Sequence, residues 1–162
     1  MGLIRSSLGK LVLVLIGLTI PLAGVQAQND EAFIEYRQKV MQSISANMGA
    51  TGDILKNKLP QHSNIAHHAY QMQSASQLIA SAFQKQLTAG KTDAKSDIWQ
   101  DWNKFVEAAK ELEAASGKLA TVAQADDMDA IAAQVKEVSK ACGGCHKPFR
   151  KPKEESYKNM KQ

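Results

Sequence analysis

Four long segments of the chain carry apolar side chains at helical spacing, and this pattern constrains the fold more than any other feature of the sequence. In the first segment Ile34, Met41, Met48 and Leu55 recur every seven residues, with Arg37 and Ile44 between them at helical spacing. In the other three, spacings of four and three alternate, which places the apolar residues on one face of an α-helix. No stretch alternates β-branched and polar residues for long enough to predict a strand. We expect helices over about 30–58, 64–87, 96–123 and 127–150.

Short breaks separate these segments, at 59–63, 88–93 and 124–127. Connections of this length force neighbouring helices to run antiparallel, so the sequence predicts an all-α, up-down-up-down four-helix bundle. Asp126 and Asp127 stand where aspartates can cap the fourth helix. The chain has 162 residues, of which 44% are hydrophobic, and this is enough to bury one core. The composition excludes a disulfide-stapled miniprotein, a disordered chain and a polytopic membrane protein.

Residues 1–27 have the pattern of a secretory signal peptide. Two basic residues precede an apolar run over 11–23, and a small-x-small cleavage site ends at Ala27. A membrane anchor is the alternative, but this apolar run of 13 residues is shorter than the roughly 20 needed to cross a bilayer. We expect the leader to be removed and residues 28–162 to form a single domain in the bacterial periplasm.

The chemistry of the chain is concentrated at Cys142-Gly143-Gly144-Cys145-His146. C-x-x-C-H is the attachment sequence of c-type haem, in which the two thiols add across the two vinyl groups of the porphyrin. The adjacent histidine then supplies an axial nitrogen to the iron. A covalent tether suits an exported protein, because the cofactor cannot diffuse away. The motif therefore predicts one covalent, iron-containing haem c.

Three other kinds of site can contain a C-x-x-C pair. A thioredoxin-like dithiol needs a βαβ pattern, which the sequence lacks. A zinc site needs further ligands, but there is no second cysteine pair, and His62, His67 and His68 lie far upstream. A single structural disulfide is compatible with an oxidising compartment. Covalent haem staining of the denatured protein would distinguish haem attachment from all three.

The motif lies close to the C-terminus, and this position limits how a haem can be covered. Only 16 residues follow His146. This tail is too short to wrap over the far face of a porphyrin, so the haem has to lie against the upstream helices. Cys142, Cys145 and His146 share one helical face, which is expected to point into the bundle. Pro148 stands in the same stretch and predicts a kink.

A more specific pattern than the haem motif is formed by three stretches: FIEYRQKVM at 33–41, IWQDW at 98–102 and CGGCHKPFR at 142–150. In this order they resemble a class II c-type cytochrome, the group that contains cytochrome c' and the low-spin cytochromes c-556. The resemblance covers essentially the whole chain after the leader. It implies a four-helix bundle with the haem covalently bound near one end, in agreement with the helical pattern.

The resemblance also implies roles for individual residues. By position, Cys142 and Cys145 hold the haem and His146 is its proximal ligand. Arg37 matches a first-helix arginine near a haem propionate, and Arg150 matches the family's basic residue beside the proximal histidine. The alternative for Arg150 is membership of a solvated basic tail. Relatives often pair through their first two helices, so a homodimer is a further implication.

Met41 matches the first-helix position that faces the open side of the iron. In low-spin members a methionine here binds iron and gives a six-coordinate electron carrier. In cytochrome c' the residue is apolar, or a methionine that does not bind, and the five-coordinate, high-spin iron accepts NO or CO. We expect Met41 to bind iron, because no bulky aromatic residue fills the pocket at this position. Helical periodicity alone would make it a core residue.

The expected function is therefore one-electron transfer between redox partner proteins, by low-spin iron ligated by His146 and Met41. Such a protein transforms no substrate, so we do not expect an enzyme. The alternative is a high-spin cytochrome c' that sequesters or senses NO or CO.

The net charge of the chain is +4, and its basic groups gather near the C-terminus. Between residues 147 and 161, six Lys and Arg residues are opposed only by Glu154 and Glu155. Such a tail could steer an acidic partner protein or meet a membrane surface, or it could be a solvated helix end. Few aromatic residues are interleaved with these charges, so we do not expect nucleic-acid binding.

Overall fold

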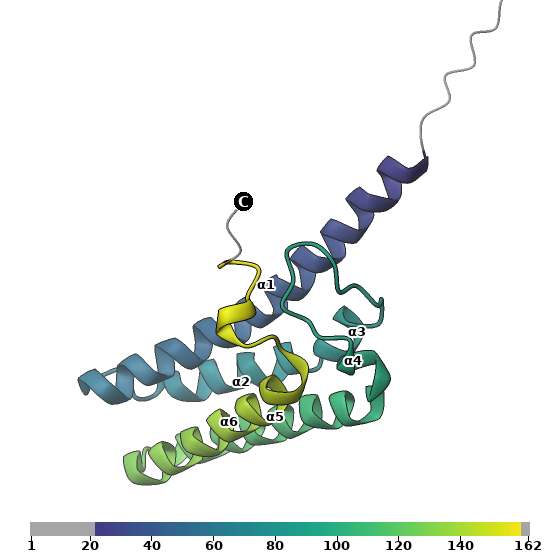
Figure 1. The fold of residues 1–162 in the computed structure, drawn as a ribbon. Coiled ribbons are helices and arrows are strands. Elements are labelled where there is room, and N and C mark those ends of the chain that lie inside the picture. Colours follow the sequence, from purple (N-terminus) through teal and green to yellow (C-terminus); the bar gives the residue numbers. More distant parts are fainter. Residues whose placement is uncertain (1–21, 160–162) are drawn as a thin grey trace, which may run out of the picture.

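The computed structural model describes residues 22–159, with side chains described from residue 28 onward. The first 21 residues of the predicted signal peptide lie outside this range, and its removal stays a prediction. The described chain contains no strand beyond a single antiparallel bridge between Ala94 and Arg150. Its elements are α1 (Leu22–Asn57), α2 (Asn64–Ser76), α3 (Ile79–Ala82), α4 (Asp97–Gln100), α5 (Trp102–Val122), η1 (Ala123–Ala125), α6 (Met128–Phe149) and η2 (Lys153–Glu155) (Figure 1).

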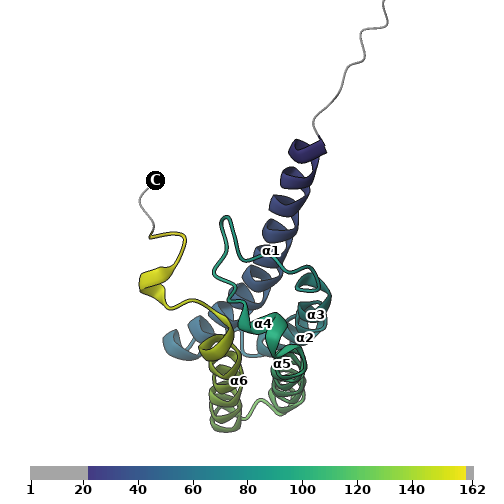
Figure 2. The ribbon, with the colours of Figure 1, turned by 45° about the vertical axis from the view of Figure 1, so that its right-hand side comes forward.

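The helices α1, α2, α5 and α6 form the predicted antiparallel four-helix bundle. α1 packs against α2, α2 against α5, and α5 against α6, while the short helix α3 contacts both α1 and α5 (Figure 1 and Figure 2). α1 and α6 are the outer members of this row and make few contacts with each other. The first turns of α1 project beyond the other helices. Across residues 22–159, no helix has an apolar stretch long enough to cross a membrane.

Burial confirms the helical spacing of the second and third segments. On α2, Ile65, Ala69 and Met72 are fully buried. On α5, Phe105 and Leu119 are buried to a similar degree. These side chains belong to one continuous core cluster, which holds α2 and α5 together at the centre of the bundle.

The prediction of which residues the first helix buries is only partly correct. Ile34 is buried, but Met41, Met48 and Leu55 are only partly buried where they pack against the core. Because α1 is covered from one side by α2 and α3, burial follows the row of residues that faces those two helices. The residues at seven-residue intervals lie at the edge of that row. Of the residues named in the predicted spacing, Arg37 and Ile44 are buried as expected. The buried row beyond Ile34 consists of Arg37, Val40, Ile44, Thr51 and Ile54.

The second predicted helix ends earlier than its spacing indicates. α3 finishes at Ala82, and residues 83–96 form a loop that leads into α4. Carbonyl groups that a continuing helix would bond internally are taken by side chains from elsewhere. The guanidinium of Arg37 donates hydrogen bonds to three of these carbonyl groups, and Trp99 Nε1 donates to the carbonyl of Phe83 at 2.8 Å. Tertiary contacts therefore replace the last turn of the predicted helix.

α6 begins and ends close to the predicted positions. Asp127 caps it as expected, since its Oδ1 accepts from the backbone N–H groups of Asp129 and Ala130 at 3.1 Å each. Pro148 lies in the last turn of the helix, and the chain becomes extended at Arg150. The proline thus coincides with the end of the helix, where a missing backbone donor is tolerated better than in the interior.

Candidate haem site

The C-x-x-C-H motif occupies the last two turns of α6. Cys142 and Cys145 are partly buried and pack against the core, whereas His146 is exposed. Residues three and four apart lie on the same side of a helix, so the three side chains form one continuous patch. The predicted inward orientation is confirmed for the two cysteines. His146 stands at the rim of the bundle, where a planar group bound by the cysteines could reach it.

The two thiols are not poised for redox chemistry. Both cysteines are free. Burial raises the pKa of Cys142, and it raises the pKa of Cys145 to about 11, with further contributions from the negative charges of Cys142 and Glu111. A redox dithiol depends on a lowered pKa, which keeps one sulfur as thiolate at neutral pH. The environment of this pair therefore argues against the dithiol alternative.

A zinc site is also disfavoured by the surroundings of the motif. Over residues 22–159, no three His, Cys, Asp or Glu side chains come together in a way that could hold a metal ion. His62 instead lies 3.7 Å from Asp126, and His68 is hydrogen-bonded to Asn47 at 2.9 Å. These two histidines thus tie loop and helix segments together, far from the motif in the sequence.

An aromatic cluster fixes the end of α6 against α5. The ring of Phe149 meets that of Phe105 edge-on, with centroids 5.4 Å apart. Phe105 also contacts Phe83 at 5.2 Å and Trp102 at 5.6 Å. Pairs of this kind contribute about 0.5–1.5 kcal/mol each beyond their buried area. They hold the turn that carries His146 in one orientation relative to the core.

Arg37 is the most buried charged residue among residues 28–159, with 2% of its surface exposed. Its Nε donates to the carbonyl of Ala82 at 3.1 Å, Nη1 donates to that of Leu87 at 3.0 Å, and Nη2 donates to that of Lys85. The guanidinium also lies 4.9 Å from the ring centroid of Phe83. This role as an anchor for the loop after α3 was not foreseen from the sequence, which gives no signal for contacts so distant along the chain.

The charge of Arg37 is unusual because no acid neutralises it within the described part of the chain. Burial lowers the pKa of its guanidinium. Its three carbonyl partners use only three of the five N–H donors that an arginine carries. A buried cation of this kind is ordinarily paired with an anion. It is therefore suited to receive a carboxylate group from a ligand.

Met41 lies on α1, one helical turn after Arg37. Its side chain is partly buried and packs on the edge of the core cluster. Met41 thus lies at the edge of the core, whereas periodicity alone would place it within the core, and part of its side chain stays accessible. Whether Met41 binds iron stays a prediction.

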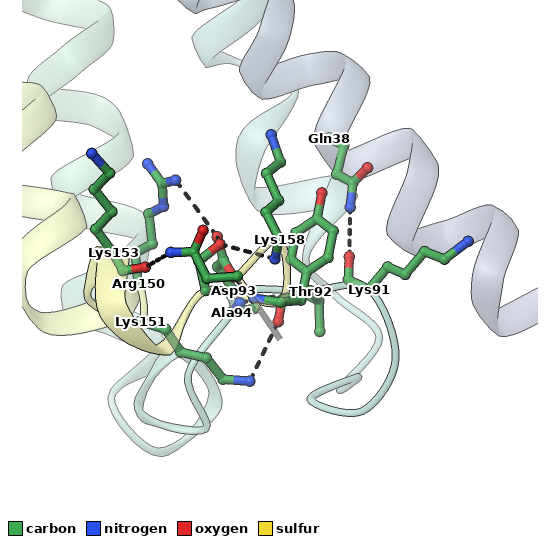
Figure 3. Close-up of polar contacts among 12 residues, drawn as sticks. Gln38, Lys91, Thr92, Asp93, Ala94, Arg150, Lys151, Lys153 and Lys158 are labelled. Carbon is green, nitrogen blue, oxygen red and sulfur yellow. Dashed lines mark hydrogen bonds and ion pairs between the residues drawn. The ribbon is translucent and has the colours of Figure 1, made fainter. Parts of the chain in front are cut away.

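Arg150 is the first residue after α6, and 53% of its side chain is exposed. It is nevertheless not a simple member of a solvated tail, because its Nη2 lies 3.6 Å from Oδ2 of Asp93 (Figure 3). Although His146 is exposed, the surrounding chain partly desolvates its ring and so lowers its pKa, and the positive charge of Arg150 lowers the pKa further. Arg150 thus acts electrostatically at the histidine one turn earlier. No pattern in the sequence points to its partner Asp93, which belongs to a loop.

A match to a known family decides the identity of the chain. A family model described as Cytochrome C' matches residues 32–150, from the early turns of α1 to the arginine that follows α6. The chain belongs to the cytochrome c' family. The match to the cytochrome c' model includes all six predicted site residues and ends before residues 151–159, which continue the chain beyond the family pattern.

Individual relatives support the assignment to cytochrome c'. The cytochrome c' of Rhodospirillum rubrum is 36% identical over 127 residues, covering 77% of this chain and 86% of that protein. The structure of cytochrome c' from Shewanella frigidimarina is similar, with a TM-score of 0.70 and 28% identity, covering 76% of this chain and 97% of that one. A variant of cytochrome c' from Alcaligenes xylosoxidans, solved as its nitric oxide complex, has a TM-score of 0.68 at 26% identity and the same coverage. Another variant of that protein was solved with carbon monoxide bound.

A cytochrome c' binds one covalent haem c, and this holds for the present chain. The residues of the site fit such a group. Two accessible thiols lie three residues apart on one helical face, and a histidine follows directly. Arg37 offers a buried cation with donors to spare for a propionate. The alternative of a structural disulfide between the cysteines is not needed to explain the pair.

Proposed function

We propose that the mature protein is a periplasmic monohaem cytochrome c' whose five-coordinate, high-spin iron binds NO or CO. The observation that carries the proposal is the family match together with relatives that are cytochromes c', one of which was solved as variants with nitric oxide and with carbon monoxide bound. The proposal takes the alternative that the sequence left open, in preference to electron transfer by a His/Met-ligated iron. Binding a gas transforms no substrate, so we do not classify the protein as an enzyme.

In this proposal the residues of α6 attach and orient the cofactor. Cys142 and Cys145 each form a thioether by adding across a vinyl group, sulfur to one carbon and hydrogen to the other, so that no oxidant is consumed. His146 would hold the iron through a ring nitrogen. When bound, the haem would supply an iron that can take a diatomic gas. Arg37 would pair with a haem propionate through the N–H donors that its carbonyl partners leave over.

Met41 supports a second candidate function. A partly accessible thioether on the turn after Arg37 is a suitable iron ligand, and its binding would make the protein a low-spin electron carrier. In the gas-binding proposal the same side chain is an apolar wall of the ligand site. The basic residues near the motif would serve the second candidate by attracting an acidic redox partner.

The effect of Met41 on gas binding distinguishes the two candidates. In the proposed function, Met41→Leu leaves the rate of CO binding to the ferrous protein nearly unchanged, because the volume of the wall is conserved. Met41→Ala shortens the wall, and we expect binding about tenfold faster, equivalent to a barrier lower by about 1.4 kcal/mol. The rates are measured by stopped-flow absorption after mixing with CO.

A different outcome of the same experiment supports the second candidate. If Met41 binds iron, Met41→Leu removes a ligand that CO has to displace, and it then accelerates binding as strongly as Met41→Ala does. Equal acceleration by both variants contradicts the gas-binding proposal. Met48→Leu is the matched control, since Met48 is also a partly buried methionine on α1 but lies two turns away.

We also propose that the protein pairs with a second copy through α1 and α2. Both helices expose aromatic side chains on their outer faces: Tyr36 and Phe33 are 46% and 40% exposed on α1, and Tyr70 is 65% exposed on α2. Aromatic residues of this kind are enriched in the cores of protein interfaces.

A further inference from the structure

The chain does not end with the haem-attachment helix, and the segment that follows it is held in place. After α6 the backbone becomes extended and pairs with the loop before α4. The N–H of Lys95 donates to the carbonyl of Phe149 at 3.0 Å, and the N–H of Lys151 donates to the carbonyl of Asp93 at 2.8 Å. These two bonds flank the bridge between Ala94 and Arg150. The backbone of Arg150 is thus fixed on both sides.

Asp93 is the centre of this arrangement. Only 11% of its side chain is exposed. Its Oδ2 accepts from the hydroxyl of Ser156 at 2.9 Å, and its Oδ1 accepts from the backbone N–H of Tyr157 at 2.9 Å (Figure 3). Oδ2 also lies 3.6 Å from Nη2 of Arg150. Ser156, which belongs to the segment beyond the family match, is itself buried.

We infer that Asp93 is a positioning residue for Arg150. The segment after the haem-attachment helix holds Asp93 in place, so that the Asp93 carboxylate fixes the Arg150 guanidinium beside His146 and offsets the positive charge of that guanidinium. The inference rests on the proposed attachment of haem with His146 as a ligand. It adds two elements that the family resemblance does not contain, namely a loop carboxylate and a C-terminal clasp made by Ser156 and Tyr157.

The chemical consequence concerns the balance between ferric and ferrous iron. Arg150 follows His146 by one helical turn, and its backbone N–H donates to the carbonyl of His146 at 3.1 Å, so the cationic side chain belongs to the turn that carries the ligand. A cation beside the ligand favours the less positive, ferrous iron, whereas a carboxylate close to that cation offsets part of the effect. The low exposure of Asp93 limits the screening of its carboxylate by solvent ions, although about half of the Arg150 side chain is exposed. Loss of the carboxylate should therefore favour reduction.

The test is a thermodynamic cycle on the haem-loaded protein, measured as the midpoint potential. We expect Asp93→Asn to shift the equilibrium about threefold toward the ferrous form, a rise of about 30 mV at about 59 mV per tenfold change for one electron. In an Arg150→Gln background the same substitution should have less than half this effect, because the cation that Asp93 holds is gone. Ser156→Ala weakens the clasp without changing a charge, so it should raise the potential in the same direction by a smaller amount.

Three results would overturn the inference: a midpoint potential unchanged by Asp93→Asn, an undiminished shift in the Arg150→Gln background, or a midpoint potential unchanged by Ser156→Ala. The midpoint potential of Arg150→Gln alone is a second measurement, which does not depend on whether Asp93→Asn folds. It should lower the potential, and an unchanged potential would show that Asp93 has no cation to act through. Failure of the haem assignment is distinguishable, because a chain without covalent haem gives no haem potential in any variant.

Discussion

Replacing Cys142 and Cys145 together by serine is expected to abolish covalent attachment of haem. A serine hydroxyl lacks the nucleophilicity of sulfur toward a vinyl group, so neither thioether can form. The mature protein, expressed in a host that attaches c-type haem, should show no haem-stained band after denaturing electrophoresis. The wild-type protein should show a strong one. We regard this loss as the largest single effect that any change in the chain can produce.

The single variants are the control for this experiment. Cys142→Ser and Cys145→Ser each leave one thiol, and one thioether is enough to retain the haem through denaturation. Their bands should persist at reduced intensity. If the wild-type protein itself carries no covalent haem, or if the double variant keeps it, the assignment of the motif is wrong. The free cysteines would then have to be explained as a disulfide or a dithiol, against the raised pKa of both thiols.

Arg37→Leu is expected to cause the largest loss of stability among single substitutions that leave the motif intact. The leucine fills part of the volume but donates no hydrogen bond, so the carbonyls of Ala82, Lys85 and Leu87 lose their common partner. We expect the free energy of unfolding to fall by about 3 kcal/mol, since hydrogen bonds to a charged donor contribute about 1.5–3 kcal/mol each and the loop can recover part of the loss from water. The midpoint of thermal unfolding should fall by roughly 10 °C.

Arg37→Lys and Gln38→Leu test whether geometry or charge is responsible. The lysine keeps the charge but cannot reach three carbonyls with one ammonium group, so its loss should be more than half of that in Arg37→Leu. Gln38, the next residue, also donates to a loop carbonyl, that of Lys91 at 2.5 Å, but from an exposed position. Its replacement should cost less than about 1 kcal/mol. Equal stability of Arg37→Leu and the wild-type holoprotein would contradict the anchoring role.

Much of the bundle could be predicted from the sequence, because its helices are determined by local patterns. The spacing of Ile65, Ala69 and Met72 required a buried helical face, and the cap at Asp127 required only an acceptor just before a helix. The haem motif is likewise local, since Cys142 and Cys145 lie within a single turn. Predictions of this kind need no knowledge of what packs against the helix.

The parts that were mispredicted depend on contacts between distant segments. The second helix stops at Ala82 because Arg37, from another helix, takes the carbonyl groups there. Met41 lies at the edge of the core rather than within it, because α1 has neighbours on one side only. Asp93 could not be recognised as a partner of Arg150, since a loop aspartate more than fifty residues away carries no pattern that points to it. Periodicity reports which face is apolar, but not which neighbours cover it.

The spin state of the iron tests the central claim most directly. Absorption and electron paramagnetic resonance spectra of the mature protein, ferric and ferrous, with and without NO, would be recorded beside those of Met41→Ala. The proposed function predicts high-spin spectra in both oxidation states, no methionine–iron charge-transfer band, direct binding of NO and little change in Met41→Ala. A low-spin wild-type spectrum with that band, which becomes high-spin in Met41→Ala, would contradict it and establish Met41 as the sixth ligand of an electron carrier.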